Sequence, residues 1–314
     1  MKPTFRHFLE LHLVVLILGF TAILGLLVTV SPLALVFWRT GLAAIGLWVV
    51  NRGLQYRIKG VGQAQFTKSA LLPPNRIIFK FLAIGVLVAA HWLLFFGAAR
   101  VANASVCLAG IATASLWTAL LEPLLTGRRL SALEIVLGLI VLAGLYVIVL
   151  ADVTHLWGLL LAVVSAGLAA LFSILNAQFT RHFNALTMTF WEMLGACLTT
   201  AVALLIYYGY VSTGTERLSF WPIGIEWLWI LVLAGACTVY AYSATVRLLR
   251  VFSAFSFNLA INLEPVYGIG LAVLIFGDRE RMTSGFYVGA VTVLAAVLIY
   301  PWLDRRMGKA REIA

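Results

Sequence analysis

The sequence predicts an all-α integral membrane protein of ten transmembrane helices, built as two inverted-topology repeats of five with both termini in the cytoplasm. Three observations predict this fold class. Of the 314 residues, 63% are hydrophobic and 11% are charged; apolar stretches of membrane-spanning length recur along the chain; and basic residues gather on alternate connections. Soluble domains average about 25% charged residues. A soluble protein is therefore excluded, and the net charge of +10 does not indicate a nucleic-acid partner.

The expected spans follow from the thickness of a bilayer. About 30 Å of hydrocarbon requires about 20 apolar residues in each helix. The second window follows the first without a small-residue cleavage site, so we interpret the first as a span and not as a removable signal peptide. The two longer connections cover residues 52–77 and 209–226. The ten windows are 11–30, 32–51, 78–98, 101–122, 132–150, 156–179, 186–208, 227–247, 252–276 and 283–303.

The distribution of Lys and Arg predicts the orientation. With the N-terminus inside, 17 of the 22 basic residues fall in inside segments, four fall in outside segments and Arg39 lies within a span. Cytoplasmic loops carry an excess of Lys and Arg. We therefore expect both termini, the 52–77 connection and the C-terminal basic residues to lie in the cytoplasm.

The two halves of the chain resemble each other at an offset of 150–153 residues. Three pairs of segments carry this likeness: Phe37–Arg39 with Phe190–Glu192, Arg100 with Arg250, and Gly127 with Gly277. Five spans is an odd number, so the second copy enters the membrane from the opposite side. The sequence thus predicts repeats over residues 1–150 and 151–314. Inverted repeats of this kind are typical of transporters with a binding site near the midplane.

The stretch Asn258–Gly277 is apolar enough to cross a bilayer and yet carries polar and helix-breaking residues. Glu264 lies about 12 residues into the ninth window, which corresponds to a depth of roughly 18 Å. A charged side chain there costs about 2.5–3.5 kcal/mol on insertion scales. We interpret Glu264 as a titrating or cation-binding carboxylate, with the alternative that it makes structural hydrogen bonds to Asn258 or Asn262. Pro265, Gly268 and Gly270 are candidate hinge residues.

Arg39 and Glu192 occupy matching positions in the two repeats. One interpretation is that they hold charged parts of a substrate or exchange ion-pair partners between states. The alternative is a static pair, or two side chains that extend toward the nearer interface.

His91 and several aromatic residues are candidates for a cavity wall. His91 lies about 14 residues into the third window, and a lone His on an apolar helix also occurs as an ordinary packing residue. Aromatic residues are common in membrane helices and interfacial belts, so packing is the alternative for each of them. The aromatic candidates are Trp38, Trp92, Trp117, Trp191, Tyr240 and Tyr242.

At this point the sequence resembles a ten-helix, EamA-type member of the drug/metabolite transporter superfamily. The residues that carry the resemblance are Leu18–Thr21, Trp38–Arg39, Arg100–Ala104, Leu263–Gly268 and Gly277–Gly289. It implies export of amino acids or varied metabolites across a bacterial inner membrane. One departure is that Ser115 matches Pro265, while Glu122-Pro123 follows one to two turns later, so the two halves are expected to gate differently.

Several motifs are absent from the sequence. No His-x-x-His spacing or phosphate-binding loop occurs, so we expect no metal and no cofactor. Cys107, Cys197 and Cys237 are widely separated and indicate no disulfide framework. An enzyme is not expected, because scattered single polar residues do not form an acid–base cluster. A lipid-modifying enzyme and a structural or signalling membrane protein are the alternatives to a transporter.

The predicted function is therefore that of a secondary transporter that exports a small amphiphilic metabolite by alternating access around a midplane cavity. Membrane lipids and the small molecule are the expected partners. Protons as the coupling ion, the identity of the substrate and the oligomeric state are left open by the sequence.

Overall fold

Helices make up all the regular secondary structure in the part of the chain that the computed structural model describes, residues 3–59, 73–127, 132–151, 153–211, 218–280 and 282–313. The basic residues Lys2, Lys68, Arg128, Arg129, Arg217 and Arg281 lie outside these ranges. The first half contains α1 (Phe5–Leu26), α2 (Pro32–Lys59), α3 (Asn75–Val101), α4 (Ala104–Ile111), α5 (Ala114–Thr126) and α6 (Ala132–Ala151).

The second half follows the same order with more irregular turns. It contains η2 (Val153–His155), α7 (Leu156–Phe179), α8 (Ala185–Ile206), η3 (Tyr207–Val211), α9 (Glu226–Val232), η4 (Leu233–Tyr242), α10 (Ser243–Leu248), α11 (Ala254–Ile261), α12 (Glu264–Phe276), η5 (Gly277–Arg279) and α13 (Ser284–Ile313). Of these, η3 and η4 are π-helical, so the eighth expected span changes its hydrogen-bond pattern in the middle.

Eight helices in the described residues are long and apolar enough to cross a membrane, and the protein is an integral membrane protein. They correspond to the first four and to the sixth to ninth expected windows. The fifth and tenth windows correspond to shorter apolar stretches, Ile135–Leu150 and Ser284–Ala296. The number of ten spans therefore stays a prediction. The 52–77 connection is shorter than expected, because α2 continues to Lys59.

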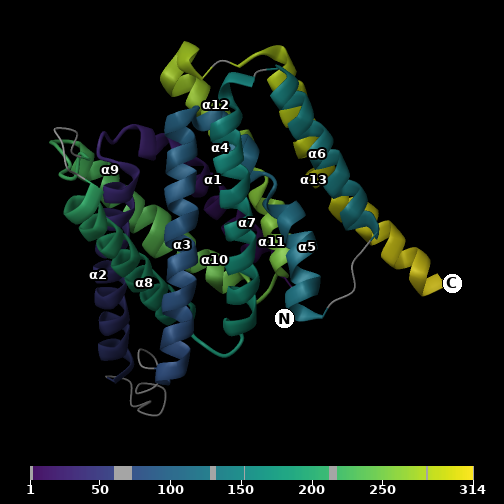
Figure 1. Ribbon diagram of the computed structural model, residues 1–314. Helices are drawn as coiled ribbons and strands as arrows, with labels where there is room; N and C mark the ends of the chain where they lie inside the picture. Colours follow the sequence, from purple (N-terminus) through teal and green to yellow (C-terminus); the bar gives the residue numbers. More distant parts are fainter. Residues whose placement is uncertain are drawn as a thin grey trace.

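Two of the spans are broken helices with equal spacing. Helix α4 has eight residues and α5 has thirteen, and α11 and α12 have the same two lengths. Their starts differ by 150 residues in both cases, from 104 to 254 and from 114 to 264. In Figure 1, α4 leads down to α5 whereas α11 leads up to α12. An inverted repeat predicts such a pair of broken helices, with equal segment lengths and opposite directions. The division of the chain at residue 150 stays a prediction.

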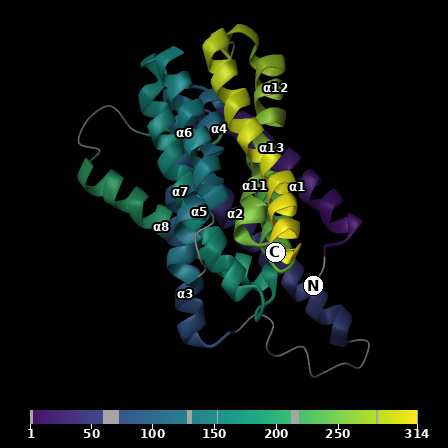
Figure 2. The ribbon, with the colours of Figure 1, turned by 90° about the vertical axis from the view of Figure 1, so that its right-hand side faces the viewer.

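Small residues allow the helices to pack closely. A Cβ atom on Gly85 of α3 would lie 2.3 Å from the carbonyl oxygen of Glu192 on α8. A Cβ atom on Gly289 of α13 would lie 2.5 Å from the carbonyl oxygen of Gly144 on α6. Backbones in direct contact gain van der Waals packing, which drives helix association in lipid. Figures 1 and 2 show that the α6–α13 pair runs side by side along one flank of the other helices.

Arg100 and Arg250, which lie 150 residues apart, stabilise equivalent helix ends. The Nη2 atom of Arg100 donates to the carbonyl of Val28 at 2.9 Å, just after α1 ends. Arg250 donates to the carbonyls of Thr180 and Phe183, just after α7 ends. Carbonyl groups at a helix C-terminus have no partner within the helix, and a cation there is favourable. Both basic residues therefore have a structural role in these turns.

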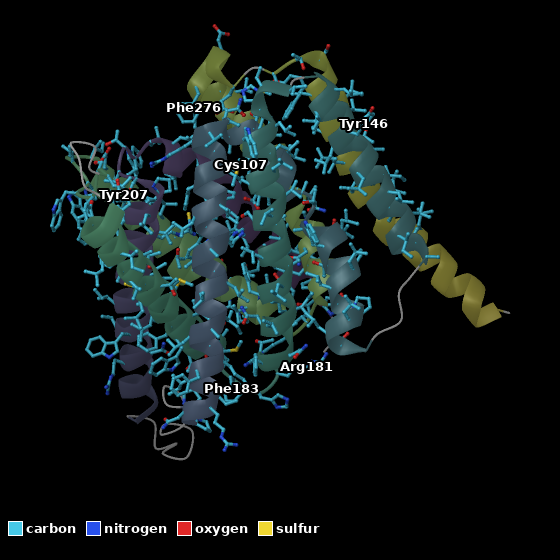
Figure 3. The ribbon with its side chains drawn as sticks, viewed as in Figure 1. Cys107, Tyr146, Arg181, Phe183, Tyr207 and Phe276 are labelled. Atoms are coloured by element: carbon cyan, nitrogen blue, oxygen red, sulfur yellow. The ribbon has the colours of Figure 1, made fainter. Side chains whose placement is uncertain are left out.

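The two ends of the bundle differ in the segments they carry. Figures 1 and 2 show the start of α1, the end of α2 and the start of α3 at the lower end. Arg181 and Phe183, in the turn between α7 and α8, also lie at this end, whereas Phe276 lies near the opposite end (Figure 3). Several of the segments that were expected inside thus lie toward the same end of the bundle.

Candidate functional site

An internal cavity of about 80 Å³ lies between the two halves of the bundle. Its wall includes six of the candidate site residues, namely Arg39, His91, Trp92, Tyr242, Asn258 and Glu264. Each water molecule occupies about 30 Å³ in the liquid, so this space holds two or three waters. Pockets for drug-sized ligands start at roughly 300 Å³. The cavity is therefore smaller than the pockets that bind drug-sized ligands.

The wall combines equivalent positions from both halves. Ile111 and Ile261, which are 150 residues apart, both line the cavity, as do His91 and Tyr242, which are 151 apart. Ala114 and Glu264 form a third pair, at an offset of 150, and each begins the second segment of a broken helix. The two broken helices thus meet at the cavity, and of this third pair only Glu264 is charged.

Arg39 reaches the cavity from α2 and is 1% exposed. Its Nε atom donates to Thr238 Oγ1 at 2.8 Å, and its guanidinium carbon lies 3.9 Å from the ring centroid of Trp92. Thr238 belongs to η4, and π-helical segments often occur at functional sites. The Nη1 atom is buried and has no hydrogen-bond partner among the described residues. A donor is therefore available for an acceptor group inside the cavity.

Glu264 faces the same cavity from the first residue of α12 and is 5% exposed. Within the described ranges, no group donates a hydrogen bond to its carboxylate, and it forms no ion pair within 4 Å. The N-terminus of a helix favours a negative charge. Glu264 and Arg39 interact electrostatically through the cavity without touching. The cavity therefore presents a guanidinium group and a carboxyl group that are not joined by a direct bond.

His91 is tied to the wall by Ser165 of α7. Its Nδ1 atom lies 2.9 Å from the Ser165 carbonyl oxygen and 2.8 Å from the Ser165 hydroxyl oxygen. A carbonyl oxygen accepts only, so Nδ1 carries the proton in this arrangement. The Ser165 hydroxyl donates in turn to the His91 carbonyl at 2.9 Å. His91 therefore links α3 to α7 in addition to lining the cavity.

Glu192 is completely buried behind Tyr242 and does not line the cavity. Its Oε2 atom accepts a hydrogen bond from the Tyr242 hydroxyl at 2.8 Å and another from Asn176 Nδ2 at 3.4 Å. Arg39 and Glu192, which the sequence analysis placed at matching repeat positions, are engaged with different partners. They do not form an ion pair in this conformation.

The two asparagines of the ninth span connect the broken helices. Asn258 donates to Thr118 Oγ1 at 2.8 Å and accepts from Ser173 Oγ at 3.3 Å. Asn262 donates to Ser115 Oγ at 2.7 Å. Neither asparagine bonds to Glu264, although the sequence analysis considered such bonds. Interhelical hydrogen bonds in membranes contribute about 0.6–2 kcal/mol each, so these pairs hold α5 against α11 beside the cavity.

The comparisons with known proteins agree with this fold. Residues 156–300, which include α7 to α12 and the start of α13, match the EamA-like transporter family. This match covers 145 of the 314 residues, just under half of the chain, and supports membership of the drug/metabolite transporter superfamily. A solved structure titled only as the crystal structure of a protein is similar to 96% of this chain and 99% of its own, at 18% identity and a TM-score of 0.67. At that identity the likeness shows a shared fold. None of the curated proteins matches.

The other candidate residues lie away from the cavity. Trp38 donates to the carbonyl of Phe220 at 2.9 Å and packs among Phe220, Trp221 and Trp227. Trp117 donates to the Val163 carbonyl at 3.0 Å. Trp191 is half-buried and packs against Phe190, and Tyr240 is 40% exposed. The position of an aromatic residue within a span did not indicate the direction in which its ring points.

The candidate hinge residues have different surroundings. Pro265 is the second residue of α12 and so occupies a helix start, where proline is tolerated. A Cβ atom on Gly268 would lie 3.0 Å from the Gly19 carbonyl oxygen, whereas nothing lies within 4 Å of one on Gly270. Gly268 therefore permits the close contact of α12 with α1. The hinge role of all three residues stays a prediction.

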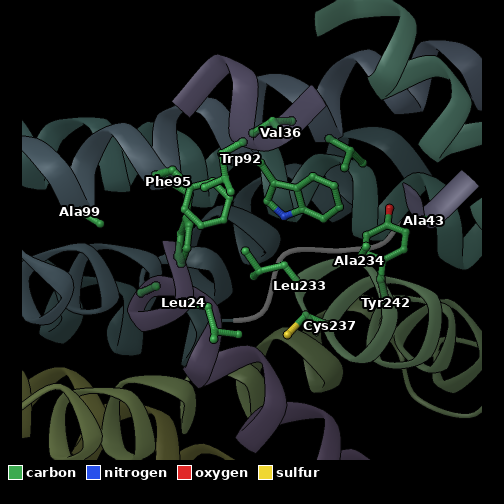
Figure 4. Packing of buried hydrophobic residues seen from close by; sticks show 14 of the residues in the cluster. Leu24, Val36, Ala43, Trp92, Phe95, Ala99, Leu233, Ala234, Cys237 and Tyr242 are labelled. Atoms are coloured by element: carbon green, nitrogen blue, oxygen red, sulfur yellow. The ribbon is translucent and has the colours of Figure 1, made fainter. Parts of the chain in front are cut away.

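Sequence reasoning did not select several residues that line the cavity. Thr21, Phe95, Phe172, Ser173 and Thr245 contribute to its wall. The repeat offset was the signal that could have found some of them, because Thr21 and Phe172 are 151 residues apart. Figure 4 shows Trp92 and Tyr242 on neighbouring helices, with Leu233 and Cys237 beside them. The ring centroids of Trp92 and Tyr242 are 5.9 Å apart.

Within the described residues, no group of three His, Cys, Asp or Glu side chains is arranged to hold a metal ion. Cys107 and Cys237 are buried and Cys197 is partly buried, and all three are free thiols.

Proposed function

We propose that this protein is a secondary transporter that exports small metabolites, in particular amino acids or similar amphiphilic compounds. The observation that carries the proposal is the pair of Arg39 and Glu264. Both are nearly completely buried, both line one cavity between the two halves, and they form no direct ion pair. A buried charge without a bonded partner is costly, which is why intramembrane charges usually mark a transport pathway.

A zwitterionic substrate fits these charges. Its carboxylate would accept hydrogen bonds from the Arg39 guanidinium, which is the stronger, charge-assisted kind. Its amine would face Glu264. The rings of Trp92, Phe95 and Phe172 supply an apolar surface for the rest of the molecule. An amphiphilic metabolite therefore suits the wall better than a purely polar or purely apolar one.

Transport would proceed by alternating access, with the units 1–150 and 151–314 rocking about the cavity. The breaks before Ala114 and Glu264 divide two helices at the cavity, and broken helices are a usual place for such motion. Pro265, Gly268 and Gly270 are the proposed hinge residues in α12. With the basic connections inside, the termini would lie in the cytoplasm of a bacterial cell and the protein in its inner membrane.

A proton is the proposed coupling ion, bound by Glu264 or by Glu192. Both carboxyl groups are buried in the membrane-spanning part. A carboxyl group in that setting can alternate between a neutral and a charged form as the surroundings open to water. Substrate efflux would then be linked to proton entry.

Counterflow in liposomes tests the proposal. Purified protein is reconstituted into liposomes that contain a mixed metabolite pool including aromatic amino acids, and efflux is measured by mass spectrometry with and without a pH gradient. We expect one class of zwitterionic metabolite to leave selectively, and faster with the gradient. Equal loss of all compounds, or efflux no greater than from liposomes without protein, would contradict it.

Glu264→Gln tests the coupling role directly. We expect this variant to lose the dependence of transport on the pH gradient and to keep its folding, because the amide retains the shape and cannot titrate. Glu10→Gln is the matched control, since Glu10 pairs with Arg247 at the surface, away from the cavity. Unchanged pH dependence in Glu264→Gln would exclude Glu264 as the coupling residue.

A further inference from the structure

Glu192 is a second buried carboxyl group, separate from the cavity wall. It is 0% exposed, and its Oε2 atom accepts hydrogen bonds from Tyr242 and Asn176, which are both neutral donors. No cation is bonded to it in the described part of the chain. A carboxylate that is ionised and fully buried normally has a positively charged partner, because its removal from water is costly. Glu192 does not follow that pattern.

Three basic residues on the helices packed against α8 are engaged elsewhere. Arg39 on α2 binds Thr238 and lies over Trp92. His91 on α3 binds Ser165, and Arg247 on α10 pairs with Glu10. The titratable side chain that does contact Glu192 is Tyr242, from η4. The surroundings of Glu192 therefore offer hydrogen bonds and no compensating charge.

Two oxygen atoms beside this contact lack partners. Glu192 Oε1 and Asn176 Oδ1 are both buried and have no hydrogen bond within the described residues. They belong to side chains that already meet through Asn176 Nδ2 and Glu192 Oε2. An ionised carboxylate and an amide oxygen are both acceptors and cannot bond to each other. A proton on Oε1 would turn that atom into a donor, and Asn176 Oδ1 is an acceptor without a partner on a side chain that already contacts Glu192.

We propose that Glu192 carries a proton in this conformation and that the Glu192–Asn176 pair is a proton-binding site of the transporter. Loading forms the O–H bond at Oε1 and removes the negative charge. Release returns the proton to water in the cavity and leaves the carboxylate. This inference deepens the proposed function by naming where a coupling proton is held, and only its connection to transport rests on that function.

Tyr242 connects the proton-binding site to the cavity. The hydroxyl of Tyr242 binds Glu192 Oε2, whereas its side chain also forms part of the cavity wall. Its ring packs against Trp92 at 5.9 Å and Phe172 at 6.0 Å, both measured between ring centroids. A substrate that displaces Tyr242 would remove a hydrogen bond from Glu192. Tyr242 is therefore a positioning residue that links cavity occupancy to the proton.

A sodium ion is the competing occupant of the site. Thr189 lies one turn before Glu192 on α8, and its Oγ1 atom is also buried without a partner in the described chain. Hard cations prefer several oxygen ligands of this kind. We favour the proton because the acid and the amide are already in contact through Asn176 Nδ2 and Glu192 Oε2, and a proton needs no further oxygen ligands. The experiment below separates the two occupants.

Infrared absorption of the purified full-length protein tests the proposal without a transport measurement. We expect the carbonyl band of a protonated carboxylic acid at neutral pH, which disappears on alkaline titration. Glu192→Gln should lose this band, and Glu264→Gln should retain it. Asn176→Leu should shift its frequency, because the amide no longer accepts the hydrogen bond. Tyr242→Phe should shift it as well while the band remains.

Two results would overturn the proposal. If the band assigned to Glu192 is the same in wild type and Glu192→Gln, the carboxyl group is ionised. If adding sodium chloride at constant pH removes the band, whereas potassium chloride does not, the site binds sodium. Thermal melting provides a second measurement. Glu192→Gln reproduces the neutral pair, so we expect it to fold and to keep its melting temperature at alkaline pH, where wild type loses stability.

Discussion

Arg39 shows at the scale of one residue how the protein keeps a cation inside the membrane. Its side chain is among the largest that are fully buried. One hydrogen bond to Thr238 and the face of Trp92 at 3.9 Å hold it in place. Desolvated cation–π contacts contribute about 2 kcal/mol or more, against about 0.5–1 kcal/mol at exposed sites. The guanidinium is thus partly compensated while its Nη1 atom remains unpartnered.

Arg39→Lys should therefore reduce transport even though the positive charge is kept. A lysine ammonium lacks the planar group that stacks on Trp92 and the Nε donor that binds Thr238. We expect the loss of these contacts to cost about 1.4 kcal/mol of substrate-binding free energy, which corresponds to a factor of about ten in affinity. Counterflow should therefore fall by about tenfold at a substrate concentration below saturation. The initial rate of counterflow in liposomes measures this.

Arg52→Lys is the matched control for this substitution. Arg52 also lies over a tryptophan, Trp48, but at 5.6 Å and on an exposed surface. Its replacement should leave both transport and melting temperature unchanged. If Arg39→Lys transports as fast as wild type, the positive charge alone is sufficient and the stacking has no role in the site.

The sequence was sufficient to select the charged residues of the site but not their partners. Arg39, Glu192 and Glu264 could be selected because a charge in an apolar stretch needs a physical reason. Their pairing depends on helix rotation, which a uniformly apolar span does not reveal. Glu192 consequently lies behind Tyr242 and outside the cavity wall. Nothing in the sequence distinguishes Asn176, its other partner, from the polar residues that make interhelical hydrogen bonds in many membrane helices.

At the scale of the helices, the breaks in the two halves occur at equivalent places without equivalent residues. The α11–α12 break precedes Pro265, whereas Ser115 occupies the matching position after the α4–α5 break. Pro123 lies inside α5, and the helix continues to Thr126. Proline therefore marks one break and is not required for the other. The sequence could therefore predict the α11–α12 break, whereas the α4–α5 break depends on tertiary contacts such as the hydrogen bond from Asn262 to Ser115.

Gly85→Ala should destabilise the crossing of α3 and α8. The added Cβ atom would lie 2.3 Å from the Glu192 carbonyl oxygen and 2.8 Å from the Ala196 nitrogen. These are backbone atoms, which cannot rotate away. Overpacking typically costs about 1–3 kcal/mol, so we expect a clearly lower melting temperature in detergent, measured by intrinsic tryptophan fluorescence.

Gly97→Ala provides the control on the same helix. A Cβ atom on Gly97 has nothing within 4 Å, and alanine is a better helix former than glycine by about 0.5–1 kcal/mol. We expect the melting temperature of this variant to stay the same or to rise. Equal melting temperatures for Gly85→Ala and Gly97→Ala would mean that the two helices separate easily at this crossing.

At the scale of the whole molecule, hydropathy predicted most of the spans but not the residues at which the helices begin and end. Eight expected windows correspond to helices of spanning length, but α2 extends to Lys59, well beyond its window. Helix ends are set by capping and loop contacts, such as Arg100 with the carbonyl of Val28, which periodicity does not contain. Charge counts predicted which segments share a side. Figure 1 places the start of α1 and the start of α3 at one end, and which compartment that end faces stays a prediction.

Cysteine labelling tests the orientation of the whole chain. Asn75, the first residue of α3, and Ser284, the first residue of α13, are both exposed. We expect Asn75→Cys to resist a membrane-impermeant maleimide in intact spheroplasts and to react after permeabilisation. Ser284→Cys should react in both, because an odd number of expected spans separates the two positions. The partly buried Cys197 is first replaced by alanine. The opposite reactivities would place the basic connections outside, against the excess of positive charge that cytoplasmic loops carry.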